Sequence, residues 1–206
     1  MRKFCWLAVL LSFCGCEAGA QDSPKGELFA GYSYLHVGSP GGTNDSVPAG
    51  LNLDATRYFF HGLGVTASFE FHHKQDYGPG QSATVLALVG GPRFKARYGK
   101  FEPFAHVLVG ETRVGLSYVN KVPPLGSPLD NDFGLSTKLG GGLDVAASRH
   151  WLVRVAELNY YRTGFSGGAG FSNTGAPERG MGFSQNNFTF SAGVVLRWQL
   201  SGDSGR

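Results

Sequence analysis

The sequence contains very few cysteines, and all of them lie in one short segment. The chain has 206 residues and three cysteines, Cys5, Cys14 and Cys16, all near the N-terminus. The remainder therefore has no disulfide to form if it reaches an oxidising compartment, and its stability must come from another source. The small secreted folds that depend on several disulfides are excluded for the same reason.

Two further features are lacking, a long apolar run and an excess of charge of one sign. The apolar run Phe4–Phe13 is shorter than the roughly 20 residues that a membrane-spanning helix needs, and no longer one follows. The formal net charge is only +3, and no run of basic residues accompanies it. Neither a helical membrane span nor binding to nucleic acid is therefore expected.

The first twenty residues have the form of an export signal. Arg2 and Lys3 supply a positive start, Phe4–Phe13 is the short apolar segment, and Ala18-Gly19-Ala20 offers a small-residue cleavage site. We predict cleavage after Ala20. This cleavage would change the formal charge from +3 to +2, because two positive residues and one negative residue leave.

Lipoprotein processing at Cys16 is the alternative to that cleavage. It would place a lipid on Cys16, but Phe13, three residues earlier, fits poorly to the aliphatic residue usual at that position. With either processing the remaining length suits one domain. The predicted organisation is a signal peptide (1–20), a short segment (21–26), one domain (27–198) and a C-terminal tail (199–206).

In place of helical periodicity the sequence has alternation of apolar and polar residues. Successive side chains of a β-strand point to opposite faces, so alternation predicts strands with one apolar face. Between residues 63 and 72, one face holds Leu63, Val65, Ala67, Phe69 and Phe71, and the other Gly64, Thr66, Ser68, Glu70 and His72. The predicted strands are Glu27–Val37, Ala49–Phe59, Leu63–His73, Ser82–Tyr98, Phe101–Gly115, Phe133–Ala147, Trp151–Thr163 and Asn187–Trp198.

The connections between these strands alternate between long and short. The tight ones are 60–62, 99–100 and 148–150, and the longer ones are Gly38–Pro48, Lys74–Gln81, Leu116–Asp132 and Gly164–Asn186. Outer-membrane barrels have short periplasmic turns and long external loops. The sequence therefore predicts an all-β fold, a closed eight-stranded antiparallel up-and-down transmembrane barrel with both ends of the mature chain in the periplasm.

Aromatic residues are expected to form two belts, because amphipathic rings prefer the depth of the lipid headgroups. The belt near the short turns would contain Tyr58, Phe59, Tyr98, Phe101, Trp151 and Trp198. The belt near the long loops would contain Tyr32, Tyr34, Phe69, Phe71, Tyr118, Phe133, Tyr160, Tyr161, Phe188 and Phe190.

Two strands break the alternation. Residues Val85–Val89 are apolar on both faces. Arg154 and Glu157 are three positions apart, so a regular strand would turn one of them toward lipid, where an Arg at mid-depth costs about 2–4 kcal/mol. A β-bulge near Ala156, or a position of Glu157 at interfacial depth, would resolve the conflict.

The polar face of the barrel collects charges of both signs. They are Asp54, Glu70, Arg93, Lys95, Glu102, Lys138, Asp144, Arg154 and Arg197. An eight-stranded barrel is just wide enough for its interior side chains to fill, so we expect a buried network of ion pairs. A narrow ion pathway is the alternative, but selective pores tend to carry rings of one sign.

Several segments resemble the eight-stranded outer-membrane β-barrel family, the group that contains the transmembrane domain of outer-membrane protein A. They are Phe29–Tyr34, Gly90–Arg93, Pro103–His106, Gly140–Asp144 and Ser191–Trp198. The resemblance covers about residues 27–198. It implies insertion in the outer membrane of a Gram-negative cell, with outer-membrane lipid and lipopolysaccharide as surroundings and a monomeric, porin-like architecture.

The last predicted strand also resembles the signal that the barrel assembly machinery reads. Ser191 is the polar position of that signal, Gly193 the glycine, Leu196 the hydrophobic position and Trp198 the aromatic. The family usually ends on the aromatic residue, whereas Gln199–Arg206 follow here. The resemblance implies the assembly machinery as a partner.

No pattern predicts a catalytic, cofactor or metal site. Gly164–Gly168 matches a nucleophile elbow formally, but no helix is predicted after it. His72 and His73 are neighbours on a strand and point apart, so they are poorly placed to share a metal, and a surface position is expected for both. No histidine has a serine two residues later, the pair that lipid A deacylase barrels carry.

A soluble barrel that binds an apolar ligand would need the opposite arrangement, with apolar residues inside and polar residues outside. We therefore expect a non-enzymatic envelope protein, structural or adhesive, that acts through its external loops. The alternatives are a narrow channel for ions or small solutes and a lipid A-modifying barrel enzyme.

Overall fold

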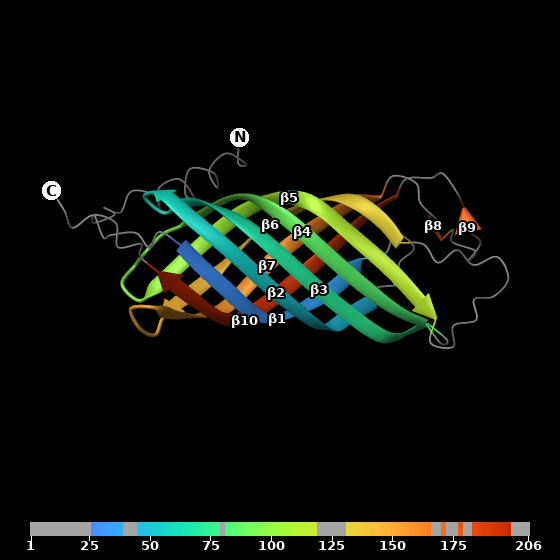
Figure 1. Cartoon of the computed structure of the whole chain (residues 1–206), viewed down its shortest axis with the longest axis horizontal. Helices are drawn as coiled ribbons and strands as arrows, with labels where there is room; N and C mark the ends of the chain where they lie inside the picture. The colour runs from blue at the N-terminus through green and yellow to red at the C-terminus, as the bar shows by residue number, and fades with distance from the viewer. Residues whose placement is uncertain are drawn as a thin grey trace, which may run out of the picture.

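The computed structural model is a closed barrel of eight long antiparallel strands (Figure 1). They are β1 (Gly26–Gly38), β2 (Asp45–Phe60), β3 (Leu63–Gly78), β4 (Gln81–Lys95), β5 (Phe101–Tyr118), β6 (Asn131–Ala146), β7 (Trp151–Phe165) and β10 (Phe183–Trp198). Each of these strands pairs with the next along the chain, and β10 closes onto β1. The predicted fold class is confirmed.

The structure describes residues 26–38, 45–78, 81–118, 131–165, 170–171, 177–178 and 183–198. The export signal, the alternative lipid on Cys16 and the tail 199–206 lie outside these residues and stay predictions. Within the described part of the chain, no helix is long and apolar enough to cross a membrane.

The barrel wall is apolar outside and polar inside. On β3 the inward residues Thr66 and Ser68 are buried, whereas the outward Val65 is 52% exposed. The two faces are those that the alternation predicted for this strand. An outer wall of exposed aliphatic and aromatic side chains would be unfavourable in water, but it matches the hydrocarbon layer of a membrane.

Two glycines allow β1 and β10 to close the barrel. The seam runs from Gly26 opposite Trp198 to Gly38 opposite Asn186, and Gly31 faces Gly193 in its middle. A Cβ atom on Gly193 would lie 2.3 Å from the carbonyl oxygen of Ala30 and 2.4 Å from the Cα of Gly31. Glycine at both positions therefore lets the two backbones approach and removes the last free edges of the sheet.

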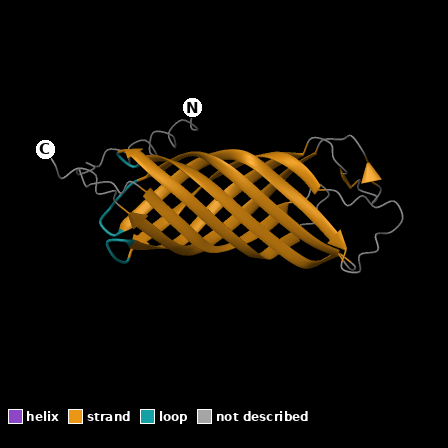
Figure 2. Cartoon of the chain, viewed as in Figure 1, coloured by secondary structure: helices purple, strands orange, loops and turns teal. Residues whose placement is uncertain are grey.

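Three connections of the barrel are short and lie on one rim, which we call the short-turn rim (Figure 2). They are residues 61–62, 96–100 and 147–150. Gly62 and Gly99 have φ values of 86° and 62°, a region that glycine adopts without strain. Gly26 and Trp198 pair at this same rim, so the barrel begins and ends on one side. The opposite rim is the far rim.

The far rim differs from the prediction in several places. The segment Lys74–Gln81 was expected to be a long loop, but β3 continues to Gly78, which pairs with Gln81 of β4. Two short strands, β8 (Gly170–Phe171) and β9 (Pro177–Glu178), pair within a segment for which no strand was predicted. Backbone hydrogen bonds extend a strand into polar sequence, where alternation no longer marks it. Strands β2, β5, β6, β7 and β10 also extend into the other predicted connections, and apart from β8 and β9 the residues between these strands lie outside the described part.

The aromatic belts are present with two corrections. Near the short-turn rim, Phe59 and Phe101 point outward and are exposed, and Phe133 and Phe188 do so toward the far rim. Tyr58 and Tyr161, however, are buried inside the barrel. Their positions along the strands placed them near the rims. Successive residues of a strand point alternately inward and outward, and this alternation, which we call parity, places both tyrosines on the inward face, where each hydroxyl has a polar partner.

Candidate functional site

The lumen of the barrel is filled by the charges that the sequence placed on the polar face. Eight of them are buried, namely Asp54, Glu70, Arg93, Lys95, Glu102, Lys138, Asp144 and Arg154. The side chain of the ninth, Arg197, is 19% exposed at the short-turn rim. Glu27 and Glu157 join them as buried carboxylates, and His72 and His106 as buried imidazoles.

A first cluster lies at the short-turn rim around Lys95. Its ammonium group donates hydrogen bonds to Glu27 at 2.7 and 2.8 Å and to Asp144 at 2.7 Å. The hydroxyl of Tyr58 donates a further hydrogen bond, 2.9 Å long, to Glu27. Strands β1, β2, β4 and β6 provide these groups, so the cluster links strands on different sides of the barrel.

Glu102 closes this rim together with two arginines. The guanidinium of Arg197 donates a 2.6 Å hydrogen bond to Glu102 and others to the carbonyl groups of Arg149 and Ser148. Arg97 lies 3.7 Å from the same carboxylate. These part-exposed arginines are the lumen groups nearest to the periplasmic side of the predicted orientation.

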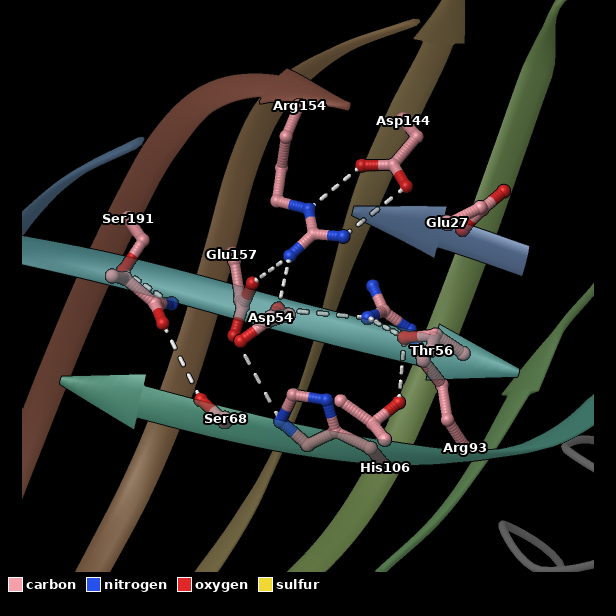
Figure 3. A network of polar contacts seen from close by, with 12 residues as sticks. Glu27, Asp54, Thr56, Ser68, Arg93, His106, Asp144, Arg154, Glu157 and Ser191 are labelled. Atoms are coloured by element: carbon pink, nitrogen blue, oxygen red, sulfur yellow. Dashed lines mark hydrogen bonds and ion pairs between the residues drawn. The ribbon is translucent and has the colours of Figure 1, made fainter. Parts of the chain in front are cut away.

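Arg154 is the centre of the network (Figure 3). Its guanidinium lies 2.8 Å from Asp144, 2.7 Å from Asp54 and 2.5 Å from Glu157. It also stacks on the rings of Phe29 and Phe104, at 3.9 and 4.4 Å from their centroids. A buried arginine with carboxylates around its edge and aromatic rings on its faces is fully occupied by the protein.

A β-bulge in β7 allows Arg154 and Glu157 to share the lumen. Ser191 of β10 pairs with Glu157, and Gly193, two residues on, pairs with Arg154, so β7 carries one extra residue there. The same shift is found on the β6 side, between Leu143 and Asp144. The predicted bulge near Ala156 is confirmed, and neither charge faces lipid.

Further from the short-turn rim, Lys138 links two carboxylates. Its ammonium group lies 2.6 Å from Glu70 and 3.7 Å from Glu157. His106 Nε2 lies 2.8 Å from Asn159 Oδ1, and the amide of Asn159 donates to Glu157. The network is therefore continuous from Lys95 at the rim to Lys138 in the middle of the barrel.

His72 is a correction to the sequence interpretation. A surface position was expected, but the residue is only 1% exposed and its Nε2 lies 3.9 Å from Glu70 Oε2. Parity on β3 had placed it on the polar face, and that face turns inward. His73 points outward and contacts the hydroxyl of Thr84 at 3.0 Å.

From the level of Lys138 toward the far rim, the lumen also contains apolar clusters. Ala87, Val89, Leu108 and Tyr161 form one apolar cluster. Leu35, Val37 and Val47 form another, with Val85 packed against it. Hydroxyl groups complete this half, with Ser136 bonded to Thr112 at 2.7 Å and to Thr163 at 3.0 Å. The apolar stretch Val85–Val89 therefore faces lipid with one set of side chains and a small apolar core with the other.

The charges of the ion-pair network balance. Six buried carboxylates face the four buried cations Arg93, Lys95, Lys138 and Arg154, together with Arg97 and Arg197 at the rim. Arg93 completes the set at 3.6 Å from Asp54 and stacks on Phe104 at 3.8 Å. An electroneutral, interlocked interior holds the wall together and leaves no ring of one sign for an ion to follow.

No catalytic or metal site emerges from the part of the chain that the structure describes. None of its residues forms a group of three or more histidine, cysteine or carboxylate side chains able to hold a metal ion. Residues 166–168 of the formal nucleophile elbow lie outside the described part, and Gly164 belongs to strand β7.

The residues of the assembly motif lie on both faces of β10. Ser191 is buried and donates a hydrogen bond to Ser33, and Gly193 lies at the seam. Leu196 pairs with Leu28, and Trp198 with Gly26, at the beginning of β1. Their role as an assembly signal stays a prediction.

Three buried titratable residues, Glu27, His106 and Glu157, were not among the predicted interior charges. Glu27 shares parity with the inward Phe29 at the start of β1, and His106 shares parity with Glu102 on β5. Glu157 was ambiguous because the bulge shifts parity by one residue. Counting alternate positions along β1 and β5 would have found Glu27 and His106, whereas the bulge hides the direction of Glu157.

Comparison with known proteins agrees with this architecture. The family model described as the outer membrane protein beta-barrel domain matches residues 6–195. No curated protein sequence matches significantly.

Solved structures of other barrels superpose on most of the chain. Neisserial surface protein A has a TM-score of 0.60 at 10% sequence identity, covering 84% of this chain and 97% of that one. The attachment invasion locus protein Ail of Yersinia pestis has 0.55 at 15%, covering 85% and 99%. The outer membrane protein AlkL in lipid bilayers has 0.52 at 13%, covering 92% and 97%. At these identities the likeness concerns the fold.

Proposed function

This chain belongs to the outer-membrane protein β-barrel family, and we propose that within it the protein is a non-enzymatic surface-interaction barrel. In this proposal the barrel is a sealed scaffold anchored in the outer membrane. The interactions take place at the far rim, through the connections between its strands. Loops held by a rigid scaffold commonly carry function, because the scaffold fixes their ends without restricting their sequence.

The observation that carries the proposal is the filled lumen. Arg154 contacts three carboxylates at 2.8 Å or less, and two aromatic rings cover the faces of its guanidinium. A permeating ion would have to separate these pairs in an environment of low dielectric, where each separation is costly. A conducting function therefore requires a rearrangement of the network, whereas a scaffold function uses it as it stands.

Two features support a role outside the lumen. The short-turn rim is closed by turns of a few residues, which leaves the far rim as the side with room for variable sequence. The structural relative Ail is named as an attachment invasion locus protein, and an Ail structure contains the heparin analogue sucrose octasulfate. This chain shares the fold with Ail and, in our proposal, a role at the cell surface.

The outer wall supports lipid and lipopolysaccharide as surroundings. Arg113 on β5 and Arg162 on β7 are exposed on the outer wall in the half toward the far rim. In the proposed orientation these cations reach the phosphate groups of lipopolysaccharide. We further propose export by residues 1–20, assembly through the β10 motif, and a monomeric barrel that binds no nucleic acid.

Two measurements on the refolded protein and on cells test the proposal. Planar bilayers should show no reproducible single-channel steps, and lipid A from overexpressing cells should keep its acyl pattern. Conductance steps that change when Lys138, Asp144 or Arg197 is replaced would contradict the sealed scaffold. An altered acyl pattern would contradict the non-enzymatic role.

The positive part of the proposal needs a binding measurement. Cells that display the protein should adhere to immobilised heparin or to host-cell matrix better than cells without it. Shortening each far-rim connection in turn should locate the activity, with a variant of the short turn at 147–150 as the matched control. Adhesion that is unchanged by every far-rim deletion would contradict a loop-based role.

A further inference from the structure

The lipid-facing side of the barrel wall carries an apolar groove. It has a volume of about 550 Å³ and crosses the lipid-facing sides of β1, β2 and β3, with contributions from the flanking strands. Its floor and walls include Leu28, Leu53, Ala55, Ala67, Phe69 and Leu88.

Cross-strand register produces the groove. Leu28 pairs with Ala55, Ala55 with Ala67, and Ala67 with Gly90, which places small residues next to each other on three strands. The neighbouring row is bulky, because Leu53 pairs with Phe69 and Phe69 with Leu88. The row of small side chains beside the row of bulky ones forms a channel. The channel runs diagonally across the wall, because the strands of a barrel are tilted.

The cation Arg57 lies near the end of this channel that faces the short-turn rim. Arg57 is exposed on the outer face of β2, two residues nearer the short-turn rim than Ala55. Its guanidinium lies 5.8 Å from the centroid of the Phe59 ring, and no carboxylate of the described chain pairs with it. An outward arginine at the edge of the hydrocarbon layer needs an anion that the protein does not provide.

Tryptophans flank this cation. Arg57 pairs with Gly26, and Gly26 pairs with Trp198. The indole ring of Trp198 lies over Gly26, where an added Cβ atom would come within 2.5 Å of it. Trp151 lines the groove itself. Indole rings at this depth prefer the interface and have an N–H group to donate.

We propose that the groove holds one acyl chain of a phospholipid from the periplasmic leaflet, with the lipid phosphate bound by Arg57. The short-turn rim faces the periplasm in the proposed orientation, and the leaflet on that side is where the phosphate of such a lipid meets Arg57. The charge of the phosphate complements the unpaired guanidinium, and its acyl chain extends along the row Leu28, Ala55 and Ala67.

Selectivity must come from charge and shape. Lipid tails surround the whole wall, so the acyl chain gains no hydrophobic stabilisation from entering the groove. Dispersion contacts along a fitting channel and charge-assisted hydrogen bonds to the phosphate remain as the sources of affinity. The proposal therefore predicts that both the channel shape and the Arg57 charge are required.

Native mass spectrometry of the refolded full-length protein tests this, with 1-palmitoyl-2-oleoyl-phosphatidylglycerol as the probe. The unchanged protein should retain one lipid per barrel. Arg57→Gln should weaken retention about tenfold, the size expected for the loss of a charge-assisted hydrogen bond. Ala67→Phe, which fills the groove, should weaken it similarly without any change of charge.

Matched variants away from the groove are the controls. Ala105→Phe makes the same exchange on the outer face of β5, and Lys100→Gln removes a cation from the turn before β5. Both should retain the lipid as the unchanged protein does, and heat-dependent gel mobility shows that each variant has folded. Equal retention by Ala67→Phe and Ala105→Phe would overturn the proposal. So would a dimer that Ala67→Phe converts to monomers, because a second copy would then be the occupant.

Discussion

Replacing Arg154 by methionine should destabilise the barrel more than any replacement at the rim of the lumen. Methionine keeps much of the side-chain volume and can still lie between Phe29 and Phe104. It removes the charge that three carboxylates share, at 2.5 to 2.8 Å. Removing one partner of a buried ion pair typically costs about 3–5 kcal/mol, because the remaining charge is left uncompensated.

In Arg154→Met the three carboxylates keep different cationic partners, and two of them keep only a distant one. Asp144 keeps Lys95 at 2.7 Å. Asp54 keeps Arg93 only at 3.6 Å, and Glu157 keeps Lys138 only at 3.7 Å. Arg154→Met also changes the ion-pair network from electroneutral to one net negative charge.

A second substitution should therefore restore part of the stability. Glu157→Gln returns the lumen to neutrality and keeps an oxygen that can accept the hydrogen bond from Asn159. Arg154→Met/Glu157→Gln should be more stable than Arg154→Met by about 1–3 kcal/mol, the penalty usual for an unpaired buried polar group. Such a rescue is the coupling that a double-mutant cycle measures.

Urea unfolding in lipid vesicles, followed by tryptophan fluorescence and by heat-dependent gel mobility, measures these differences. Arg197→Met is the comparison, because Glu102 keeps Lys95 at 3.6 Å and Arg97 at 3.7 Å after this change, so it should destabilise the barrel less than Arg154→Met does. The reasoning is refuted if Arg154→Met unfolds within about 1 kcal/mol of the unchanged protein. It is also refuted if Glu157→Gln destabilises the Arg154→Met background further.

Three further predictions concern the wall, the seam and the N-terminus. Leu139→Arg should reduce assembly and cost about 2–4 kcal/mol, since Leu139 is 55% exposed to the membrane side, whereas Thr66→Ala inside should cost about 1 kcal/mol; equal denaturant midpoints would contradict the assigned faces. Gly193→Val should prevent closure of the seam, which gel mobility would show as loss of the compact form. Mass spectrometry of the mature protein should find a chain starting after Ala20, and a lipid-modified Cys16 at its start would refute this cleavage.

Alternation was sufficient to predict the barrel and most of its lumen. Each strand of an eight-stranded barrel has one face in lipid and one in a narrow interior, so the parity of a residue decides its environment. Glu70 and Lys138 were placed correctly on this basis alone, and they are 2.6 Å apart in the structure. Pairing between particular residues was beyond reach, because it depends on the shear of the barrel.

Where alternation gave a wrong inward or outward assignment, or none, a physical cause can be named. The bulge of β7 shifts parity by one residue, so Glu157 could not be assigned from spacing. His72 follows its strand into the lumen, although histidine near a strand end is common on surfaces. Tyr58 was assigned to a belt from its height, but Glu27 offers its hydroxyl a partner inside at 2.9 Å. The strands extend past the apolar band because backbone pairing continues where no lipid imposes alternation.

The two halves of the lumen differ, and this difference bears on function. Ion pairs reach across the barrel from the short-turn rim to Lys138 and Glu70 in its middle, and apolar contacts and hydroxyl groups fill the part toward the far rim. Lys95 joins β4 to β1 and β6, and Arg154 joins β7 to β2, so these ion pairs link strands that are not neighbours in the sheet. These cross-barrel ion pairs help to hold the barrel closed without a contribution from the far-rim connections. Far-rim sequence can then vary without loss of the fold, which is the condition under which a surface-interaction role can diversify.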